Sequence, residues 1–253
     1  AYDEGLFELD APVSQYIEPL QGGDKSKITV RQLLYHESGM PAAVNMFNMM
    51  MDTATYEGKL IQNTQSETYS VKIENGAYGH KDARLRRDIT SSEPTNGFRI
   101  AAADGIYVGQ ATMDTIMSRI YNIKLRDTKK YNYSCLNFCL LMNMEEWVTG
   151  RPHNEWVDET IFAPLGAFHT GYRPLEKWDK SDIAPTEKDN FLRRQTVRGY
   201  VHDETANFSG GVQGNAGLFS NANDLAKLCQ MWLNGGEYGG ERLLSEKTVK
   251  LFT

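Results

Sequence analysis

The most informative stretch of the sequence is Tyr133-Ser134-Cys135-Leu136-Asn137-Phe138-Cys139-Leu140-Leu141, which runs on to Thr149-Gly150. Beyond Cys135 apolar residues recur at three- and four-residue spacing, which predicts an amphipathic α-helix over residues 136–149. Its buried face is expected to hold Leu136, Cys139, Leu140, Met144, Trp147 and Val148. Gly150 predicts the helix end, because glycine adopts a left-handed C-terminal cap at little cost. A Tyr-Ser pair directly before such a helix is fixed in space by the packing behind it.

The composition of the whole chain excludes several classes of protein. Its 253 residues suffice for one large domain or two small ones with a sizeable core. The net charge of −6, without a basic stripe, argues against a nucleic-acid partner. No stretch approaches the roughly 18 uninterrupted apolar residues of a membrane helix, so no membrane span is expected. The cysteines at 135, 139 and 229 form neither a disulfide framework nor a zinc-ligand spacing.

Helical periodicity recurs on both sides of this stretch. It predicts helices over residues 9–17, over 29–38 with Thr29 as N-cap, over 46–51, from Thr112, from Pro152, over 221–235 and over 245–252 with Ser245 as N-cap. The helix over 221–235 is expected to point Leu225, Leu228, Trp232 and Leu233 inward. Strand patterns are few and short, with one hairpin near residues 69–73 and irregular chain from 167 to about 189. Residues 44–110 are the hardest to interpret, and the long loops expected over residues 63–96 would either cover a site or be mobile.

Both ends of the sequence resemble interrupted helices. Residues 1–5 have the pattern of a last helical turn closing on Gly5, and the helix predicted from Ser245 has not ended where the sequence stops. We therefore expect the chain to be a piece of a longer protein, truncated at both ends.

The sequence holds no recognisable serine nucleophile. It contains no Gly-x-Ser-x-Gly, no Ser-x-x-Lys and no Lys-Thr-Gly. Ser38 follows His36 by two residues, and side chains two apart on a helix point in different directions. The segment over residues 36–39 is therefore predicted to be a structural helix end closed by glycine. Taken alone, Tyr133 is most simply a packed residue whose hydroxyl is hydrogen-bonded.

The cluster His202-Asp203-Glu204 has a metal-binding and a structural interpretation. Alternation along extended chain would send His202 and Glu204 to one side and Asp203 to the other. Two ligands are too few for a metal, so no metal and no cofactor are predicted. We favour a loop tied by hydrogen bonds and ion pairs to a nearby arginine, Arg193, Arg194 or Arg198. The glycine-rich residues 210–217 lack a phosphate-loop ending, and close backbone approach is the expected reason for them.

Four groups of segments, taken in order, resemble a known family. They are Leu9-Asp10-Ala11-Pro12-Val13, residues 28–41, residues 133–166 with Tyr133-Ser134-Cys135 and Ala163-Pro164-Leu165-Gly166, and residues 216–245. Together they resemble the serine β-lactamase and penicillin-binding-protein-like family, in particular the branch with class C β-lactamases. The resemblance implies an α+β fold, of which this chain supplies mainly the helical subdomain of a β-lactamase/transpeptidase-like fold with few short strands. Residues 1–253 would be one domain, with a variable insertion near the site over about 44–110.

The resemblance also implies a mechanism built on three motifs. In the family a Ser-x-x-Lys serine attacks a carbonyl, a Tyr-x-Asn tyrosine assists proton transfer, and a Lys-Thr-Gly or His-Thr-Gly strand binds substrate. By the order of the motifs along the family, the first is expected before residue 1 and the third after residue 253, so only the middle motif maps here and Tyr133 is the expected catalytic residue. Ser134, Cys135, His202 and Asp203 are the expected substrate-binding residues. Cys135 stands where the family has Asn or Asp, and a thiol cannot supply the paired donor and acceptor of an amide.

Two function hypotheses follow from the resemblance. The first is a fragment of a serine hydrolase, acting on an amide or ester of small-molecule or peptidoglycan-like type by acyl-enzyme chemistry and inactive alone. The second is a non-catalytic module that binds cell-wall glycan or peptide, or packs on a fused glycosidase. Residues 183–187 and 199–204 resemble a subgroup fused behind a family 3 glycoside hydrolase in Bacteroidetes-like bacteria. The family implies a periplasmic or exported protein.

Overall fold

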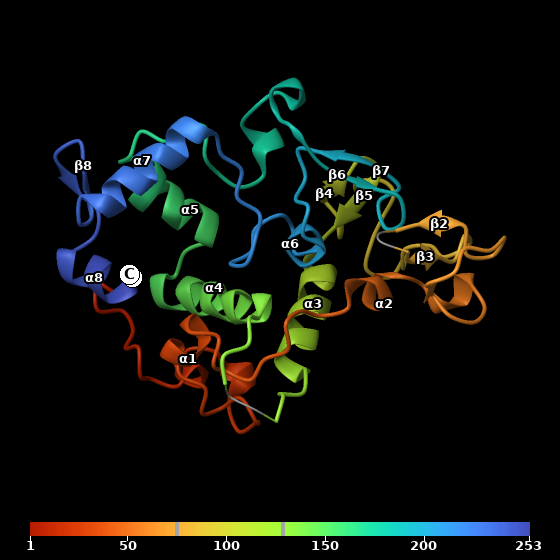
Figure 1. Ribbon diagram of the computed structural model, residues 1–253, viewed down its shortest axis with the longest axis horizontal. Coiled ribbons are helices and arrows are strands. Elements are labelled where there is room, and N and C mark those ends of the chain that lie inside the picture. The colour runs from red at the N-terminus through yellow and green to blue at the C-terminus, as the bar shows by residue number, and fades with distance from the viewer. Residues whose placement is uncertain (74–75, 128–129) are drawn as a thin grey trace. The chain divides into compact units, whose positions relative to one another are not determined.

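The computed structural model describes residues 1–73, 76–127 and 130–253 (Figure 1). The chain forms two compact units, each built from segments that are far apart in sequence. The first unit comprises Ala1–Ala43, Tyr121–Arg173 and Val212–Thr253. The second comprises Val44–Ile120 and Pro174–Gly211. In the described ranges, no helix is both long enough and apolar enough to cross a membrane.

The first unit is mainly helical. Its elements are the 3-10 turns η1 (Val13–Gln15) and η2 (Glu18–Leu20), the helices α1 (Val30–Leu34), α4 (Cys135–Thr149) and α5 (His153–Val157), the π-turn η4 (Asp158–Phe162), the helices α7 (Ala222–Leu233) and α8 (Glu246–Phe252), and the short hairpin of β8 (Glu237–Tyr238) and β9 (Glu241–Arg242). The segment predicted as a helix over residues 9–17 is only the turn η1, with Pro12 as its N-cap.

Local capping rules placed the start of α1 and the end of α4 correctly, but the helix predicted to run to residue 38 ends at Leu34. The Thr29 hydroxyl accepts a hydrogen bond from the backbone N–H of Gln32, whose side chain returns to the Thr29 N–H, so α1 starts with a full capping box. Gly150 ends α4 in the left-handed conformation, at φ 66°, and its N–H bonds to the carbonyl of Glu146. The ends of both helices are thus fixed by hydrogen bonds between near neighbours in sequence.

The buried face of α4 is shorter than predicted. Leu136, Cys139, Leu140 and Met144 are buried as expected. Trp147, predicted to be buried, is 70% exposed. It lies seven residues after Leu140 and so on the same stripe, but in the last turn, where the described chain covers little of the indole.

Helix α7 packs against the segment that follows α5, in a cluster centred on Met231, Phe162 and Leu165. Figure 1 shows α5 and α7 side by side in this unit. Leu228 and Trp232 pack against the cluster as predicted, but Leu225 and Leu233 are 46% and 80% exposed. The buried stripe runs through Met231, and at about 100° per residue these two leucines point well away from it.

The second unit holds most of the strands. Its elements are α2 (Met46–Met50), η3 (Thr53–Thr55), β1 (Ile61–Gln62), β2 (Val71–Lys72), β3 (Tyr78–Gly79), β4 (Ile100–Ala103), β5 (Ile106–Val108), α3 (Gln110–Asn122, through Ile120), η5 (Pro174–Glu176), η6 (Lys180–Asp182), β6 (Pro185–Asp189), β7 (Gln195–Arg198) and α6 (Glu204–Phe208). The strands pair antiparallel, in the order β1-β3-β2, as β4-β5 and as β6-β7. The fold class is α+β, as predicted.

The hairpin of β6 and β7 replaces part of the chain predicted to be irregular. Its turn is organised by the buried carboxylate of Asp189, which accepts the backbone N–H groups of Phe191, Leu192 and Arg193 at 2.8–2.9 Å. The Arg193 Nε donates to the same carboxylate at 2.7 Å. A buried carboxylate needs such partners, and here they fix the loop between the strands.

Candidate active site

Tyr133 lies directly before α4, in a backbone fixed by its neighbours. Ser134 is the N-cap residue, and it is fully buried. Its hydroxyl donates to the carbonyl of Pro41 at 2.6 Å, and the N–H of Cys135 donates to the carbonyl of Ala42 at 2.9 Å. A buried hydroxyl engaged in this way suits positioning of Tyr133 more than contact with a ligand.

His36 is the residue that connects α1 with the tyrosine. Its ring centroid lies 4.7 Å from that of Tyr133, with the planes tilted by 44°. Its Nδ1 lies 3.1 Å from the backbone N–H of Ser134 and 3.3 Å from the side-chain amide nitrogen of Asn137. Both neighbours are donors, so Nδ1 is the acceptor and the neutral ring carries its proton on Nε2. His36 adopts φ 57°, in the left-handed region.

The buried side chains of Ser38 and Asn137 form a hydrogen-bonded pair beside His36. The Ser38 hydroxyl donates to Oδ1 of Asn137 at 2.7 Å, and Nδ2 of Asn137 donates to the carbonyl of Leu33 at 3.0 Å. Oγ of Ser38 also accepts the N–H of Met40 at 3.1 Å. The structural role predicted for Ser38 is therefore confirmed. Asn137 was missed, because in sequence it resembles an ordinary residue of the helix.

The Tyr133 side chain is 56% exposed. The Cys135 thiol, two residues further, donates a hydrogen bond to its hydroxyl, with 3.7 Å between sulfur and oxygen. A thiol is a weak donor, so the Tyr133 hydroxyl receives only a weak hydrogen bond from the position where the family carries an amide or a carboxyl. The predicted catalytic residue and Cys135 are thus in contact.

The glycine-rich segment contacts α4 behind the tyrosine. A Cβ on Gly214 would lie 2.1 Å from the carbonyl oxygen of Phe138, so only glycine fits there. The next residue, Asn215, accepts a hydrogen bond from the Cys139 thiol at 3.5 Å. The close backbone approach predicted for these glycines is confirmed at this position.

His202 and Asp203 belong to the second unit, whereas Tyr133, Ser134 and Cys135 belong to the first. Asp203 is the N-cap of α6, and its carboxylate accepts the N–H of Ala206 at 2.8 Å. His202 is exposed, with Nδ1 3.2 Å from the carbonyl of Thr186. The structure therefore gives Asp203 a capping role, and the substrate-binding role of both residues remains a prediction.

The loop at His202 is tied to an arginine by a hydrogen bond, as predicted. Nη2 of Arg193 donates to the His202 carbonyl at 3.1 Å. The ion pairs of this arginine are with Asp189 and Glu187 of the β6–β7 hairpin and not with the predicted cluster at residues 202–204. Across the described residues, no group of three or more His, Cys, Asp or Glu side chains could hold a metal ion.

These features lie in a chain that a family model, Beta-lactamase, matches over residues 1–253. The chain belongs to the β-lactamase family. The ordered resemblance of its segments to this family is thereby confirmed.

Curated relatives share substantial identity with part of the chain. A protein of Escherichia coli K12, named "Putative D-alanyl-D-alanine carboxypeptidase", is 40% identical over 165 residues, which cover 60% of this chain and 38% of the relative. A protein of Salmonella schwarzengrund with the same name is 42% identical over 136 residues, covering 49% and 32%. The aligned chain thus spans well under half the length of these relatives.

Solved structures show the same fold at low identity. The class C β-lactamase of Rhodobacter sphaeroides matches with TM-score 0.51 and 17% identity, over 99% of this chain and 50% of the other. The D-amino acid amidase of Ochrobactrum anthropi matches with TM-score 0.55 and 15% identity, over 98% and 52%. Identity this low shows a shared fold and nothing more.

Proposed function

We propose that this chain is part of a serine hydrolase that cleaves peptides ending in D-amino acids, with Tyr133 as its proton-transfer residue. The observation that carries the proposal is the geometry of Tyr133. Its ring is exposed, yet it is held between the His36 ring and the fixed start of α4. A catalytic group must be accessible to substrate and rigid, and this arrangement supplies both properties.

In this role the tyrosine hydroxyl would relay one proton. A serine hydroxyl is a weak nucleophile until a base takes its proton. As the serine oxygen attacks the scissile carbonyl, its proton would pass through the Tyr133 hydroxyl to the nitrogen of the departing D-amino acid. Water would then attack the acyl group on the serine. Its proton would return through the Tyr133 hydroxyl to the serine oxygen as the acyl group leaves. Ser134 would position the tyrosine, and Cys135 would contact its hydroxyl and the substrate.

The names of the relatives support a peptide-type substrate. A D-alanyl-D-alanine carboxypeptidase removes a terminal D-alanine from a peptide, and the relatives that carry this name are 40–42% identical to this chain over their aligned parts. A peptidoglycan-like peptide would also require the protein to be exported. His202 and Asp203 are proposed to bind this substrate.

We also propose that the 253-residue chain is a fragment and is inactive alone. It contains no Ser-x-x-Lys sequence, so the serine and lysine of the mechanism would come from outside it. The test compares the purified chain with the full-length product of its gene. The chain should neither hydrolyse a D-alanyl-D-alanine peptide nor react with a fluorophosphonate. The full-length protein should do both, and Tyr133→Phe should lower its turnover about 100-fold or more.

The matched control is Tyr131→Phe. Tyr131 is also exposed and also lies against His36, at 5.9 Å, so its loss tests the surroundings without removing the proposed proton relay. Its turnover should stay within about twofold of the unmodified protein. Hydrolysis by the 253-residue chain alone, lost on Tyr133→Phe, would refute the fragment proposal.

A non-catalytic module is the second candidate, and Cys135 favours it. The thiol replaces the amide or carboxyl that the family uses for substrate contact, and it occupies the hydroxyl of Tyr133. Such a module would bind cell-wall glycan or peptide, or pack on a fused glycosidase. A full-length protein that binds a peptidoglycan fragment but does not react with a fluorophosphonate would establish this candidate.

A further inference from the structure

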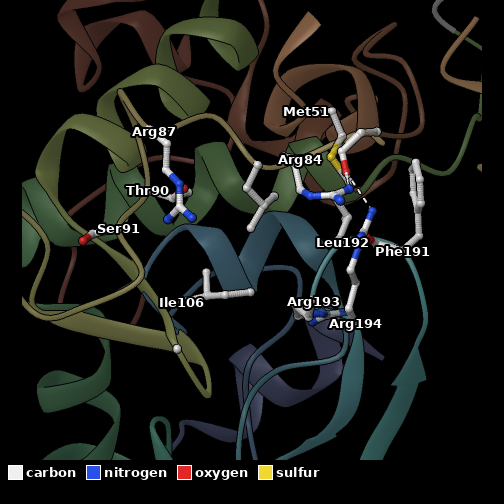
Figure 2. A pocket seen from close by; sticks show the side chains of 13 residues that line it. Met51, Arg84, Arg87, Thr90, Ser91, Ile106, Phe191, Leu192, Arg193 and Arg194 are labelled. Atoms are coloured by element: carbon white, nitrogen blue, oxygen red, sulfur yellow. Dashed lines mark hydrogen bonds between the residues drawn. The ribbon is translucent and has the colours of Figure 1, made fainter. Parts of the chain in front are cut away.

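A cavity of about 160 Å³ within the second unit has several arginines on its wall (Figure 2). Arg84, Arg87, Arg193 and Arg194 line it, together with the buried apolar side chains of Met51, Ile106 and Phe191. Among the described residues, no aspartate or glutamate lines it. Arg84, Arg87 and Arg194 are exposed and so partly solvated, whereas Arg193 is buried, and the partners of each arginine show which of them is available to a ligand.

Arg193 is accounted for by the fold itself. Its side chain is fully buried, and it forms ion pairs with Asp189 and Glu187. It also donates to the carbonyl oxygens of Val201 and His202, at 2.8 and 3.1 Å. These four acceptors take up almost all the donors of a guanidinium group. Arg193 is therefore a structural residue and is not available to a ligand.

Arg84 and Arg194 are instead held side by side. Nη1 of Arg84 donates to the carbonyls of Lys81 and Ala83 at 2.9 and 3.0 Å. Nη2 of Arg194 donates to the same two oxygens, at 2.7 Å to Ala83 and 3.4 Å to Lys81. Within residues 1–73, 76–127 and 130–253, neither guanidinium has a carboxylate at ion-pair distance. Two positive charges thus share one pair of neutral acceptors.

The pKa of the Arg194 guanidinium reflects the nearby charge of Arg84. Desolvation and the charge of Arg84 lower the pKa of the Arg194 guanidinium, while the charges of Asp189 and Asp82 act in the opposite direction. The two carboxylates do not compensate fully. The fold therefore keeps a like-charged pair whose mutual repulsion a bound anion would relieve.

Arg87 adds a third positive charge. Figure 2 shows its guanidinium on one side of the cavity and those of Arg84 and Arg194 on the other. Arg87 forms neither an ion pair nor a hydrogen bond with any residue that the structure describes. Its neighbour Arg86 differs, because Asp88 neutralises it through two hydrogen bonds. Of the three arginines in residues 84–88, Arg86 is thus paired with Asp88, whereas Arg84 and Arg87 line the cavity.

We propose that this cavity binds a small oxyanion, a carboxylate or phosphate group, at the guanidinium groups of Arg84 and Arg194, with Arg87 contributing charge. Guanidinium groups recognise both anions through parallel N–H donors, and apolar walls strengthen the attraction. The volume is well above the roughly 10–15 Å³ that one water needs on the same measure, so the cavity has room for one such group. The site lies wholly within the second unit and does not involve Tyr133, so it goes beyond the proposed function.

The test is a titration of the purified chain with inorganic phosphate, acetate and citrate at constant ionic strength. Binding is followed by calorimetry and by the melting temperature. We expect saturable binding of at least one of these anions, and the comparison among them shows whether phosphate or carboxylate is preferred. Arg84→Gln should weaken that binding about tenfold, which corresponds to about 1.4 kcal/mol. Arg87→Gln should also weaken it, without loss of folding, because Arg87 bonds to no other described residue.

The matched control is Arg99→Gln. Arg99 is an exposed arginine of the same unit that does not line the cavity, so its removal changes the net charge equally and breaks only an exposed hydrogen bond to Asn96. Absence of saturable binding by all three anions would overturn the proposal. Equal weakening by Arg84→Gln and Arg99→Gln would also overturn it, because the attraction would then be a non-specific effect of charge. Circular dichroism of each variant without anion establishes that the fold is retained.

Discussion

The backbone N–H of Ser134 donates a hydrogen bond to Nδ1 of His36, 3.1 Å away, across a sequence separation of 98 residues. This bond ties the start of α4 to the end of α1. Because the His36 ring also packs on the ring of Tyr133, one side chain positions both the helix and the proposed catalytic residue.

Replacing His36 by alanine should lower the free energy of unfolding by about 1–3 kcal/mol, because the buried N–H of Ser134 loses its acceptor. His36→Asn should cost less, since asparagine tolerates the left-handed φ of 57° and offers an acceptor of its own. Urea denaturation measures both variants. Glu37→Ala, at an exposed neighbouring position, is the control and should change stability by less than about 0.5 kcal/mol. Equal stability of all three variants would refute the positioning role of His36.

The buried pair of Ser38 and Asn137 should behave as one unit. Asn137→Ala leaves the Leu33 carbonyl and the Ser38 hydroxyl without their partner, at about 1–3 kcal/mol for each buried group. Ser38→Ala removes one bond of the same network. In a double-mutant cycle measured by urea denaturation, the two costs should therefore not add. Additive costs would show that the two side chains act independently.

In this region, the sequence predicts interactions between near neighbours in the chain but not those between distant segments. The Thr29 N-cap, the Gly150 cap and the Ser245 N-cap were predicted because each joins residues within one helical turn. The ring of His36 reaches α4 across about a hundred residues, and no local pattern encodes that contact. The same limit hid Asn137, whose partners lie in another segment of the chain.

The errors on α4 and α7 have a different cause. Periodicity shows which side of a helix is apolar. The elements that pack against the helix decide how many of its turns are buried and which side of it is covered. Trp147 lies beyond the covered turns of its helix, and Leu233 lies on the far side from Met231. The cavity with Arg84 and Arg194 was also not predictable, because the two arginines converge only through the carbonyls of Lys81 and Ala83.

Asp224 should make the first unit sensitive to acid. Desolvation alone would raise the pKa of its carboxyl, but hydrogen bonds from the His169 N–H and from Lys227 and Thr170 hold it below the usual 3.8. A lowered pKa in the folded state means that the stabilisation is present above about pH 4 and is lost as the pH falls through the folded value. Asp224→Asn should therefore cost about 2 kcal/mol near pH 7 and little near pH 2. A cost that does not vary with pH would refute this assignment.

Glu204 should have the opposite effect in the second unit. Burial raises the pKa of its carboxyl above the usual 4.5, and the neighbouring Asp203 and Asp189 add to the shift. A raised pKa in the folded state gives a contribution to stability that is complete below pH 4.5 and is lost as the pH rises through the folded value. Glu204→Gln removes this loss. Its stability relative to the unmodified protein should rise between pH 4.5 and pH 8, as measured by thermal unfolding.

The control for this pH dependence is Glu93→Gln, at an exposed position of the same unit. Its stability relative to the unmodified protein should stay within about 0.5 kcal/mol across the range. If Glu204→Gln and Glu93→Gln show the same pH profile, burial of Glu204 has no consequence for stability.

Replacing Cys135 tests directly whether the thiol at this position lowers the activity of the site. Asparagine at this position would replace a weak thiol donor next to the Tyr133 hydroxyl with an amide that both donates and accepts. If the full-length protein is a hydrolase, Cys135→Asn should raise kcat/KM on a D-alanyl-D-alanine peptide about tenfold or more, the worth of one well-placed hydrogen bond. Cys229→Asn, at an exposed position on α7, is the control for loss of a thiol. An unchanged rate in both variants would mean that the third position of the motif does not contact the substrate in this protein. A rate that falls in Cys135→Asn would mean that the thiol itself serves the reaction.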